Sequence, residues 1–300
     1  MRRRQTYKVA EHLFLIDLPN DSLLWDRMQV SYGPFEVFPD KNDDFIFSLA
    51  VCEIAEVEDA SLVYSNKSDV EPGFVVVEVY ETPEGHYFEF TQPGSQEVNA
   101  RLSITKDFST AFLDLSGRPF EQWIAFNTSV DFCYLLATAG RNTLLAHASS
   151  LIYEGKAYLF LGKSGTGKST HSRMWQAALP GVILMNDDHP VIRVENGTAT
   201  AYGSPWSGKT PCYKNISAPI GGVIRICRAP HNKAVYLPPI QAYASLMTSC
   251  SGMTWDKELA DGKDYTLQQI ISSTPCWVME CLPDEDAARV CMKAVTSVQK

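Results

Sequence analysis

The sequence predicts an α+β protein in which a mostly antiparallel β module is followed by an α/β domain. Three observations carry this prediction. Short runs of β-branched and aromatic residues separated by turns dominate residues 1–117. Apolar residues change to helical spacing over 118–142, which predicts a helical connector. Strand, loop and helix patterns then alternate over 143–300, as they do in α/β domains.

In the β module, the clearest signal is a hairpin. Residues 74–80 and 86–90 are rich in Val, Phe and Tyr, and they flank the turn sequence Thr82-Pro83-Glu84-Gly85. Further strands are expected at 13–16, 45–51, 101–105 and 110–115. The module carries no chemical motif, so substrate recognition, regulation and an oligomer interface all stay open as its role. A homo-oligomer is compatible with the sequence.

The α/β domain is expected to contain most of the chemistry. Its predicted strands lie at 144–147, 150–153, 157–161, 182–185, 190–194, 198–202, 222–226 and 276–281. Its predicted helices lie at 169–179, 239–251, 266–273 and 284–297.

Residues 162–169, called the glycine loop from here on, fit the pattern G-x-x-x-x-G-K-[ST] in full. The glycines let successive backbone N–H groups turn inward toward phosphate oxygens, and the following helix adds its partial positive charge. Lys168 is expected to bridge the β- and γ-phosphates, and Ser169 to bind magnesium. The loop therefore predicts a nucleoside triphosphate site. Its expected ligand-binding residues are Gly162, Ser164, Gly165, Thr166, Gly167, Lys168, Ser169 and Thr170.

Two adjacent carboxylates, Asp187 and Asp188, directly follow the apolar strand at 182–185. This is where proteins with such loops keep the acidic residue that holds magnesium. One carboxylate would serve the metal, and the other would orient or deprotonate an acceptor hydroxyl. Either residue fits either role. The alternative is a solvated turn with Asx character.

Three further candidates come from less specific signals. His147 precedes the glycine loop and is either a structural or an active-site histidine. The glycine-rich segment 202–210 contains Ser207 and Lys209, which suit a phosphate or an acidic substrate; its alternative is a hairpin turn with Trp206 in the core. Arg225 is expected to offset charge on the transferred group or to form an ordinary surface pair.

The composition of the chain argues against several classes of binding partner. The formal net charge of -9 argues against DNA or RNA as the main partner. No apolar run approaches the roughly 18 residues that span a bilayer, and the basic start lacks the apolar stretch of a secretory signal. The eight cysteines show no zinc-site spacing, so free thiols in a reducing cytoplasm are expected.

Three segments together resemble the catalytic domain of HPr kinase/phosphorylase and its relatives: LAHASS (145–150), GKSGTGKSTH (162–171) and MNDD (185–188). The glycine loop is also similar to that of ATP-dependent phosphoenolpyruvate carboxykinase. The resemblance covers residues 143–298 and implies the fold of this group, with ATP and Mg²⁺ as cofactors. It implies that His147 lies near the transferred phosphate, that Lys168 and Ser169 serve nucleotide and magnesium, and that Asp187 and Asp188 serve metal binding and acceptor activation. Thr170 stands where HPr kinase typically has Glu.

The first functional hypothesis is an ATP- and magnesium-dependent kinase that acts on a hydroxyl of a protein serine or a small molecule. The catalytic set would be Asp187, Asp188, His147 and Lys168. The second is a nucleotide-binding regulatory protein without phosphotransfer. The third is a carboxykinase-like lyase that acts on oxaloacetate. The sequence does not name the acceptor.

Overall fold

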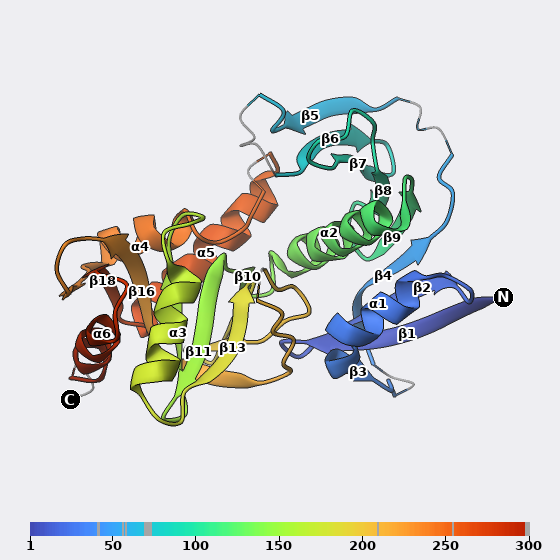
Figure 1. The fold of residues 1–300 in the computed structure, drawn as a ribbon. Coiled ribbons are helices and arrows are strands. Elements are labelled where there is room, and N and C mark those ends of the chain that lie inside the picture. The colour runs from blue at the N-terminus through green and yellow to red at the C-terminus, as the bar shows by residue number, and fades with distance from the viewer. Residues whose placement is uncertain are drawn as a thin grey trace. The chain divides into compact units, whose positions relative to one another are not determined.

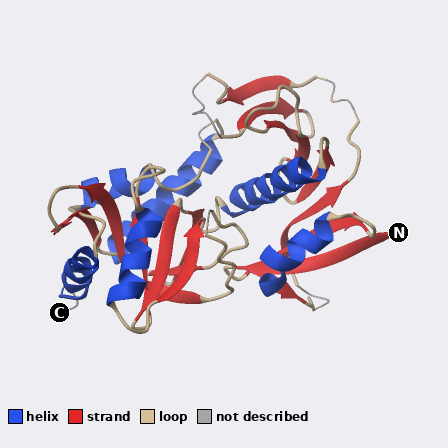
Figure 2. Cartoon of the chain, in the orientation of Figure 1, coloured by secondary structure: helices blue, strands red, loops and turns tan. Residues whose placement is uncertain are grey.

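The computed structural model describes residues 1–40, 43–55, 57, 59–68, 74–208, 210–253 and 255–297. Its internal contacts divide the chain into two compact units, residues 1–138 with 254–256 and residues 139–253 with 257–300 (Figure 1). Each unit is built around its own nine-stranded sheet. The described residues also form six α-helices (Figure 2), so the predicted α+β class is confirmed.

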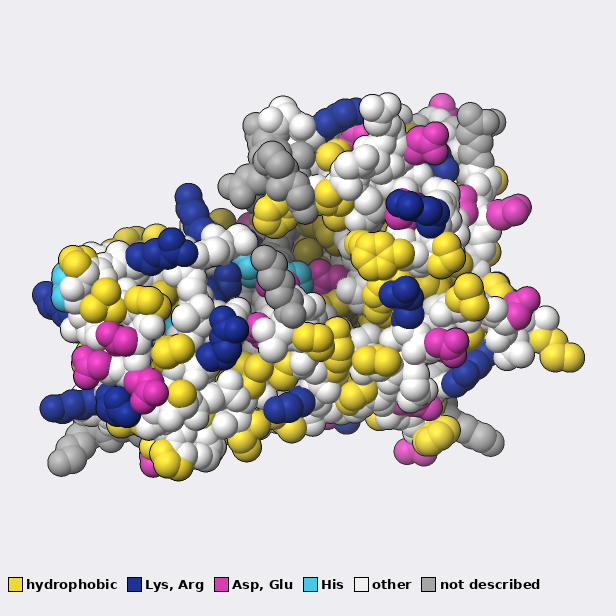
Figure 3. Space-filling model, in the orientation of Figure 1, with side chains coloured by type: hydrophobic (Ala, Val, Ile, Leu, Met, Phe, Trp, Pro, Cys, Tyr) yellow, Lys and Arg dark blue, Asp and Glu magenta, His cyan; other side chains and the backbone are white. Residues whose placement is uncertain are grey.

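Charged side chains of both signs are interspersed over the face of the molecule drawn in Figure 3, and hydrophobic side chains lie between them. No large area of this face carries basic side chains alone. Within the described residues, none of the helices is long and apolar enough to span a bilayer.

In the first unit, the strands follow the order β3-β1-β2-β4-β9-β8-β7-β6-β5. All neighbours are antiparallel except that β4 runs parallel to both β2 and β9. The predicted hairpin is confirmed, because β6 and β7 pair from Val76↔Thr91 to Thr82↔Gly85. The strands are β1 (Arg2–Val9), β2 (His12–Pro19), β3 (Glu36–Val37), β4 (Phe45–Val51), β5 (Ser61–Ser65), β6 (Val76–Thr82), β7 (Gly85–Thr91), β8 (Ala100–Thr105) and β9 (Thr110–Leu115).

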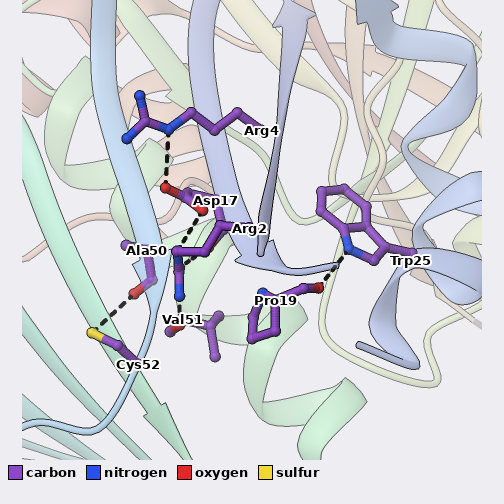
Figure 4. Close-up of polar contacts among 8 residues, drawn as sticks. All are labelled: Arg2, Arg4, Asp17, Pro19, Trp25, Ala50, Val51 and Cys52. Atoms are coloured by element: carbon purple, nitrogen blue, oxygen red, sulfur yellow. Dashed lines mark hydrogen bonds and ion pairs between the residues drawn. The ribbon is translucent and has the colours of Figure 1, made fainter. Parts of the chain in front are cut away.

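Two of the basic residues near the start of the chain, Arg2 and Arg4 of strand β1, converge on one buried carboxylate (Figure 4). Arg2 Nε donates to Asp17 Oδ1 at 2.7 Å, and Arg4 Nε donates to Asp17 Oδ2 at 3.1 Å. Arg2 also donates to the Val51 carbonyl of β4 at 3.0 Å. Asp17 is only 8% exposed, so this pairing compensates the cost of burying its charge. The arginines thus tie three strands together.

Two helices complete the first unit. Helix α2 (Pro119–Thr138) packs aromatic side chains onto the sheet, with Phe132 and Phe90 ring centroids 5.1 Å apart. The hydroxyl of Tyr134 on α2 donates to the Val9 carbonyl at 3.0 Å. The sequence predicts a connector over residues 118–142, whereas the structure places α2 within the first unit. Helix α1 (Leu24–Ser31), and the short 3₁₀ helix at Gly33–Phe35, have no counterpart in the predicted elements.

In the second unit, the main sheet order is β10-β14-β15-β16-β12-β11-β13, and β18 pairs with β16 and β17. Strands β12, β16 and β18 are parallel neighbours, and the other pairs are antiparallel. The strands are β10 (Thr143–Leu145), β11 (Ala148–Tyr153), β12 (Lys156–Leu161), β13 (Ile183–Asp188), β14 (Val191–Glu195), β15 (Thr198–Tyr202), β16 (Ser217–Arg228), β17 (Lys233–Tyr236) and β18 (Cys276–Cys281). The helices are α3 (Lys168–Ala178), α4 (Pro239–Met247), α5 (Lys257–Ser273) and α6 (Glu285–Ser297).

The central strand β12 is buried on both faces, which explains its unbroken apolar sequence. Leu159 and Leu161 belong to the core under α4 and α5. Tyr158 and Phe160 belong to the core under α3 and α6. Two packed layers therefore fix β12 at the point where it leads into the glycine loop.

His171 of α3 lies in the second of these cores. Its Nε2 accepts a hydrogen bond from Trp175 Nε1 at 3.1 Å, and its ring lies 4.8 Å from that of Phe160. Burial lowers the pKa of His171 from 6.5 to about 4. The imidazole is thus neutral in the folded protein at pH 7 and packs as part of the core.

This burial predicts a pH-dependent stability. Below pH 6.5 the unfolded chain binds a proton at His171, and the folded chain does not until about pH 4. The free energy of unfolding should therefore fall as pH falls through this window, by about 2 kcal/mol between pH 7 and pH 5. Denaturant titrations of wild type and His171→Gln at both pH values isolate this contribution. Equal losses in the two proteins would contradict it.

All eight cysteines are free thiols, as the sequence predicts. Burial raises the pKa of Cys250 and of Cys276 to about 12, so these thiols stay protonated at neutral pH.

Candidate active site

The glycine loop connects the end of β12 to the start of α3. Gly162, Gly165 and Gly167 have φ values of 151°, 76° and 113°, which side chains disfavour. A Cβ on Gly162 would also lie 2.6 Å from Thr166 Oγ1. Gly167 caps α3 without a side-chain hydrogen bond, so the first amides of the helix stay available for an external anion.

Arg228 at the end of β16 donates hydrogen bonds to backbone carbonyls of the glycine loop. Its Nη2 donates to the Gly165 carbonyl, and its Nε donates to the Thr166 carbonyl at 3.4 Å. The Thr166 hydroxyl donates to the Lys163 carbonyl at 2.8 Å within the loop. Because β16 runs parallel to β12 and beside it, the two strands end at the same edge of the sheet. From the sequence, two roles are open for Arg228, which are to offset charge on the transferred group and to form an ordinary surface pair.

The Lys168 side chain folds back over the loop. It is 9% exposed, and its Nζ donates to the Gly162 carbonyl at 3.0 Å. The same ammonium lies 3.0 Å from His147 Nε2. Burial lowers the pKa of Lys168, while the charges of Asp188 and Asp187 oppose this shift. The loop thus contains a partly desolvated cation that is bonded to one of its own carbonyls.

His147 connects Lys168 to the acidic pair. Its Nε2 lies 3.4 Å from Asp188 Oδ1. Burial lowers the pKa of His147, Lys168 and His189 lower it further, and Asp188 opposes them. A neutral imidazole can accept from the Lys168 ammonium at Nε2, which places its own proton on Nδ1.

Asp187 and Asp188 end strand β13, and they differ in their surroundings. Asp187 is 5% exposed, whereas the Asp188 side chain is 39% exposed. Asp187 pairs across the strands with Ser149, whose hydroxyl lies 2.6 Å from that of Ser172 on α3. Directly paired residues project to the same face of a sheet, so Asp187 projects to the face that carries α3. Asp188, the next residue on the strand, alternates to the other face.

A buried amide holds the acidic pair in place. Asn186 is fully buried, and its Oδ1 accepts from the backbone N–H groups of Asp188 at 3.0 Å and His189 at 2.9 Å. Its Nδ2 donates to the Trp206 carbonyl at 2.9 Å and the Ser204 hydroxyl at 3.1 Å. Asn186 is not among the predicted site residues, although it lies in the MNDD segment directly before the acidic pair.

Replacing Asn186 should be costly. Asn186→Asp keeps the size but turns two donated hydrogen bonds into contacts between oxygen atoms, and Asn186→Leu leaves buried backbone groups without a partner. Each variant should lose about 2–4 kcal/mol of unfolding free energy in denaturant titrations. Gln268→Ala, at an exposed position of α5, is the control and should change stability by less than about 0.5 kcal/mol. Losses no larger than that of the control would refute this role for Asn186.

The glycine-rich segment 203–208 lies against the acidic pair. Gly208 N donates to the Asp187 carbonyl at 3.0 Å, and a Cβ there would lie 3.1 Å from the Asp188 Cβ. Ser207 forms an isolated bridge with Asp188, while its hydroxyl donates to the Thr210 carbonyl at 2.8 Å. Lys209 lies outside the described residues.

The Arg225 side chain binds the end of α4 and the residues that follow it. Its Nε donates to the Ser245 hydroxyl at 2.7 Å, and its Nη2 lies 2.8 Å from Thr248 Oγ1 and 3.3 Å from Ser249 Oγ. The Ser249 carbonyl in turn accepts from the backbone N–H of His147 at 2.7 Å. Arg225 therefore fixes the segment that supports His147, and among the described residues the hydrogen bonds of its guanidinium go to this segment rather than to the glycine loop.

The structure thus brings Lys168, His147 and Asp188 into one contact chain at the glycine loop. Comparison with known proteins finds no matching family model and no matching curated protein. Among solved structures, the Hpr(Ser) kinase/phosphatase from Coxiella burnetii is similar over 52% of this chain and 99% of its own, with 11% sequence identity and a TM-score of 0.31.

Proposed function

We propose that this protein is an ATP- and Mg²⁺-dependent phosphotransferase that moves the γ-phosphoryl group to a hydroxyl. The observation that carries the proposal is the contact chain from the Gly162 carbonyl through Lys168 Nζ and His147 Nε2 to Asp188 Oδ1. It joins a phosphate-loop lysine to a partly exposed carboxylate, which are the cation and the base that in-line phosphoryl transfer needs.

The roles follow from these surroundings. The loop amides and Lys168 hold the β- and γ-phosphates and offset the charge that develops during transfer. The carboxylate of Asp188 is accessible, so it orients the acceptor hydroxyl and takes its proton. His147 lies between the two and positions the Lys168 ammonium. Arg225 acts through the α4 segment as a positioning residue.

The donor set fits magnesium. Within the described residues, no group of three or more His, Cys, Asp or Glu side chains could enclose a metal ion. Magnesium bound to a nucleotide needs only one or two protein oxygens, because phosphates and water supply the others. We assign this role to Ser169 on the first turn of α3 and to Asp187, which projects to the same face. Bound there, the ion would neutralise phosphate charge.

The acceptor is a protein serine or a small molecule with a hydroxyl, in the cytoplasm. This choice of acceptor follows the resemblance of segments 145–150, 162–171 and 185–188 to HPr kinase/phosphorylase. No ligand is assigned to Ser207 on the acceptor side of the site. The acidic net charge of -9 favours neither DNA nor RNA as partner.

An assay of ATP turnover tests the proposal. Purified protein with Mg²⁺ and γ-labelled ATP should transfer label to a hydroxyl acceptor or, slowly, to water. ATP that raises the melting temperature but is never consumed would indicate the regulatory alternative. Consumption of oxaloacetate with ATP would indicate the lyase.

A further inference from the structure

A cavity of about 600 Å³ opens beside the glycine loop within the second unit. One wall is formed by the first turns of α3, including Thr170 and Met174. The facing wall is formed by residues that follow β16 and β18, including Ala229 and Leu282. These strands and β12 are parallel neighbours, so their carboxyl ends open onto the same edge, which is where ligands bind in such sheets.

We infer that this cavity receives the base and sugar of the nucleoside triphosphate. The inference rests on the proposed function, which places the phosphates on the glycine loop. Thr166 and Gly167 belong both to the loop and to the cavity lining, so a ligand whose phosphates occupy the loop reaches the cavity with its remaining part. The volume lies within the range of about 300–1,000 Å³ that holds ligands of this size.

The lining determines how the base is recognised. Among the described residues that line the cavity, none carries a carboxylate or a carboxamide. The Arg228 guanidinium is bonded to loop carbonyls, and the Thr166 hydroxyl is bonded to the Lys163 carbonyl. His171 accepts from Trp175 Nε1. The Thr170 hydroxyl accepts from Arg173 Nη2 at 3.4 Å, and the remaining lining side chains are apolar or a thiol. The lining therefore offers mainly apolar contact, not a set of side-chain hydrogen bonds to the base edge.

An apolar site discriminates weakly between related bases. Strong discrimination requires buried polar groups that the correct base pairs with and the wrong base leaves unpaired. Adenine and guanine nucleotides should consequently bind with similar affinity, within about tenfold. The base should still add at least about tenfold to the affinity of the triphosphate group alone.

Calorimetric titrations with ATP, GTP and inorganic tripolyphosphate, each with Mg²⁺, test these expectations. We expect ATP and GTP to bind within about tenfold of each other and both to bind more tightly than tripolyphosphate. ATP that binds no more tightly than tripolyphosphate would overturn the cavity assignment while leaving the loop assignment intact. A preference for either base of more than about a hundredfold would overturn apolar recognition. If neither ATP nor tripolyphosphate binds, the proposed function itself fails.

Two variants test whether the contribution of the base to ATP affinity arises in the cavity. Ala229→Phe and Leu282→Trp add side-chain volume at its wall; Leu282 is 39% exposed, so that variant should fold. Each should weaken ATP binding at least about tenfold and leave tripolyphosphate binding unchanged. Ile240→Trp on α4, at a position 76% exposed and outside the cavity lining, is the matched control. Wild-type ATP affinity in both folded cavity variants would refute the assignment.

Discussion

Replacing Lys168 with alanine should lower the rate of γ-phosphoryl transfer by about a thousandfold. The ammonium lies 3.0 Å from the Gly162 carbonyl and 3.0 Å from His147 Nε2, at the centre of the contact chain. Its loss removes the buried ammonium of the glycine loop, whereas the other lysine of the loop, Lys163, is exposed. Single-turnover transfer from γ-labelled ATP measures the effect.

The Lys168→Ala protein should still fold. Burial lowers the pKa of Lys168, which means that the folded state holds the charged form at a cost. Lys163→Ala, at an exposed position of the same loop, is the matched control and should retain most of the transfer rate. If Lys168→Ala transfers phosphate at the rate of this control, Lys168 has no part in the chemistry.

Asp188→Asn should separate nucleotide binding from transfer. The carboxamide keeps the shape of the side chain but cannot take a proton from the acceptor hydroxyl. We expect transfer to fall between about a hundredfold and ten-thousandfold, with ATP affinity changed by less than about tenfold. Transfer rates and calorimetric affinities of the same preparation provide both numbers.

Asp261→Asn makes the same chemical change on the exposed surface of α5 and should leave both quantities unaltered. An Asp188→Asn variant that binds ATP and transfers phosphate like wild type would remove Asp188 from the proposed mechanism.

Local patterns predicted much of the second unit. Strand β12, the glycine loop and helix α3 follow from a short apolar run, glycines that permit positive φ, and a helical sequence after Lys168. Strand β18 was predicted at its observed bounds, Cys276–Cys281. These signals lie within a few consecutive residues, so the sequence alone contains them.

Other features depend on contacts between distant residues. The apolar residues of α2 have helical spacing, which predicts a helix but not the unit to which it belongs. Its packing on the first sheet assigns it to the first unit. Arg225 lies near the end of an apolar strand in the sequence, where a substrate-binding arginine could lie, but Ser245 and Ser249 bind its guanidinium. Asn186 gains its role from Ser204 and Trp206, which follow it on another segment. The hydrophobic periodicity of a sequence does not indicate hydrogen-bond partners on distant segments.

A crystal structure with Mg²⁺ and a non-hydrolysable ATP analogue is the most direct test of the proposed function. We expect the γ-phosphate beside Lys168 Nζ with a clear path to the Asp188 carboxylate, the metal at Ser169 and Asp187, and the base in the cavity beside Met174. A triphosphate bound away from the glycine loop, or one whose γ-phosphate faces away from His147 and Asp188, would contradict the proposed function.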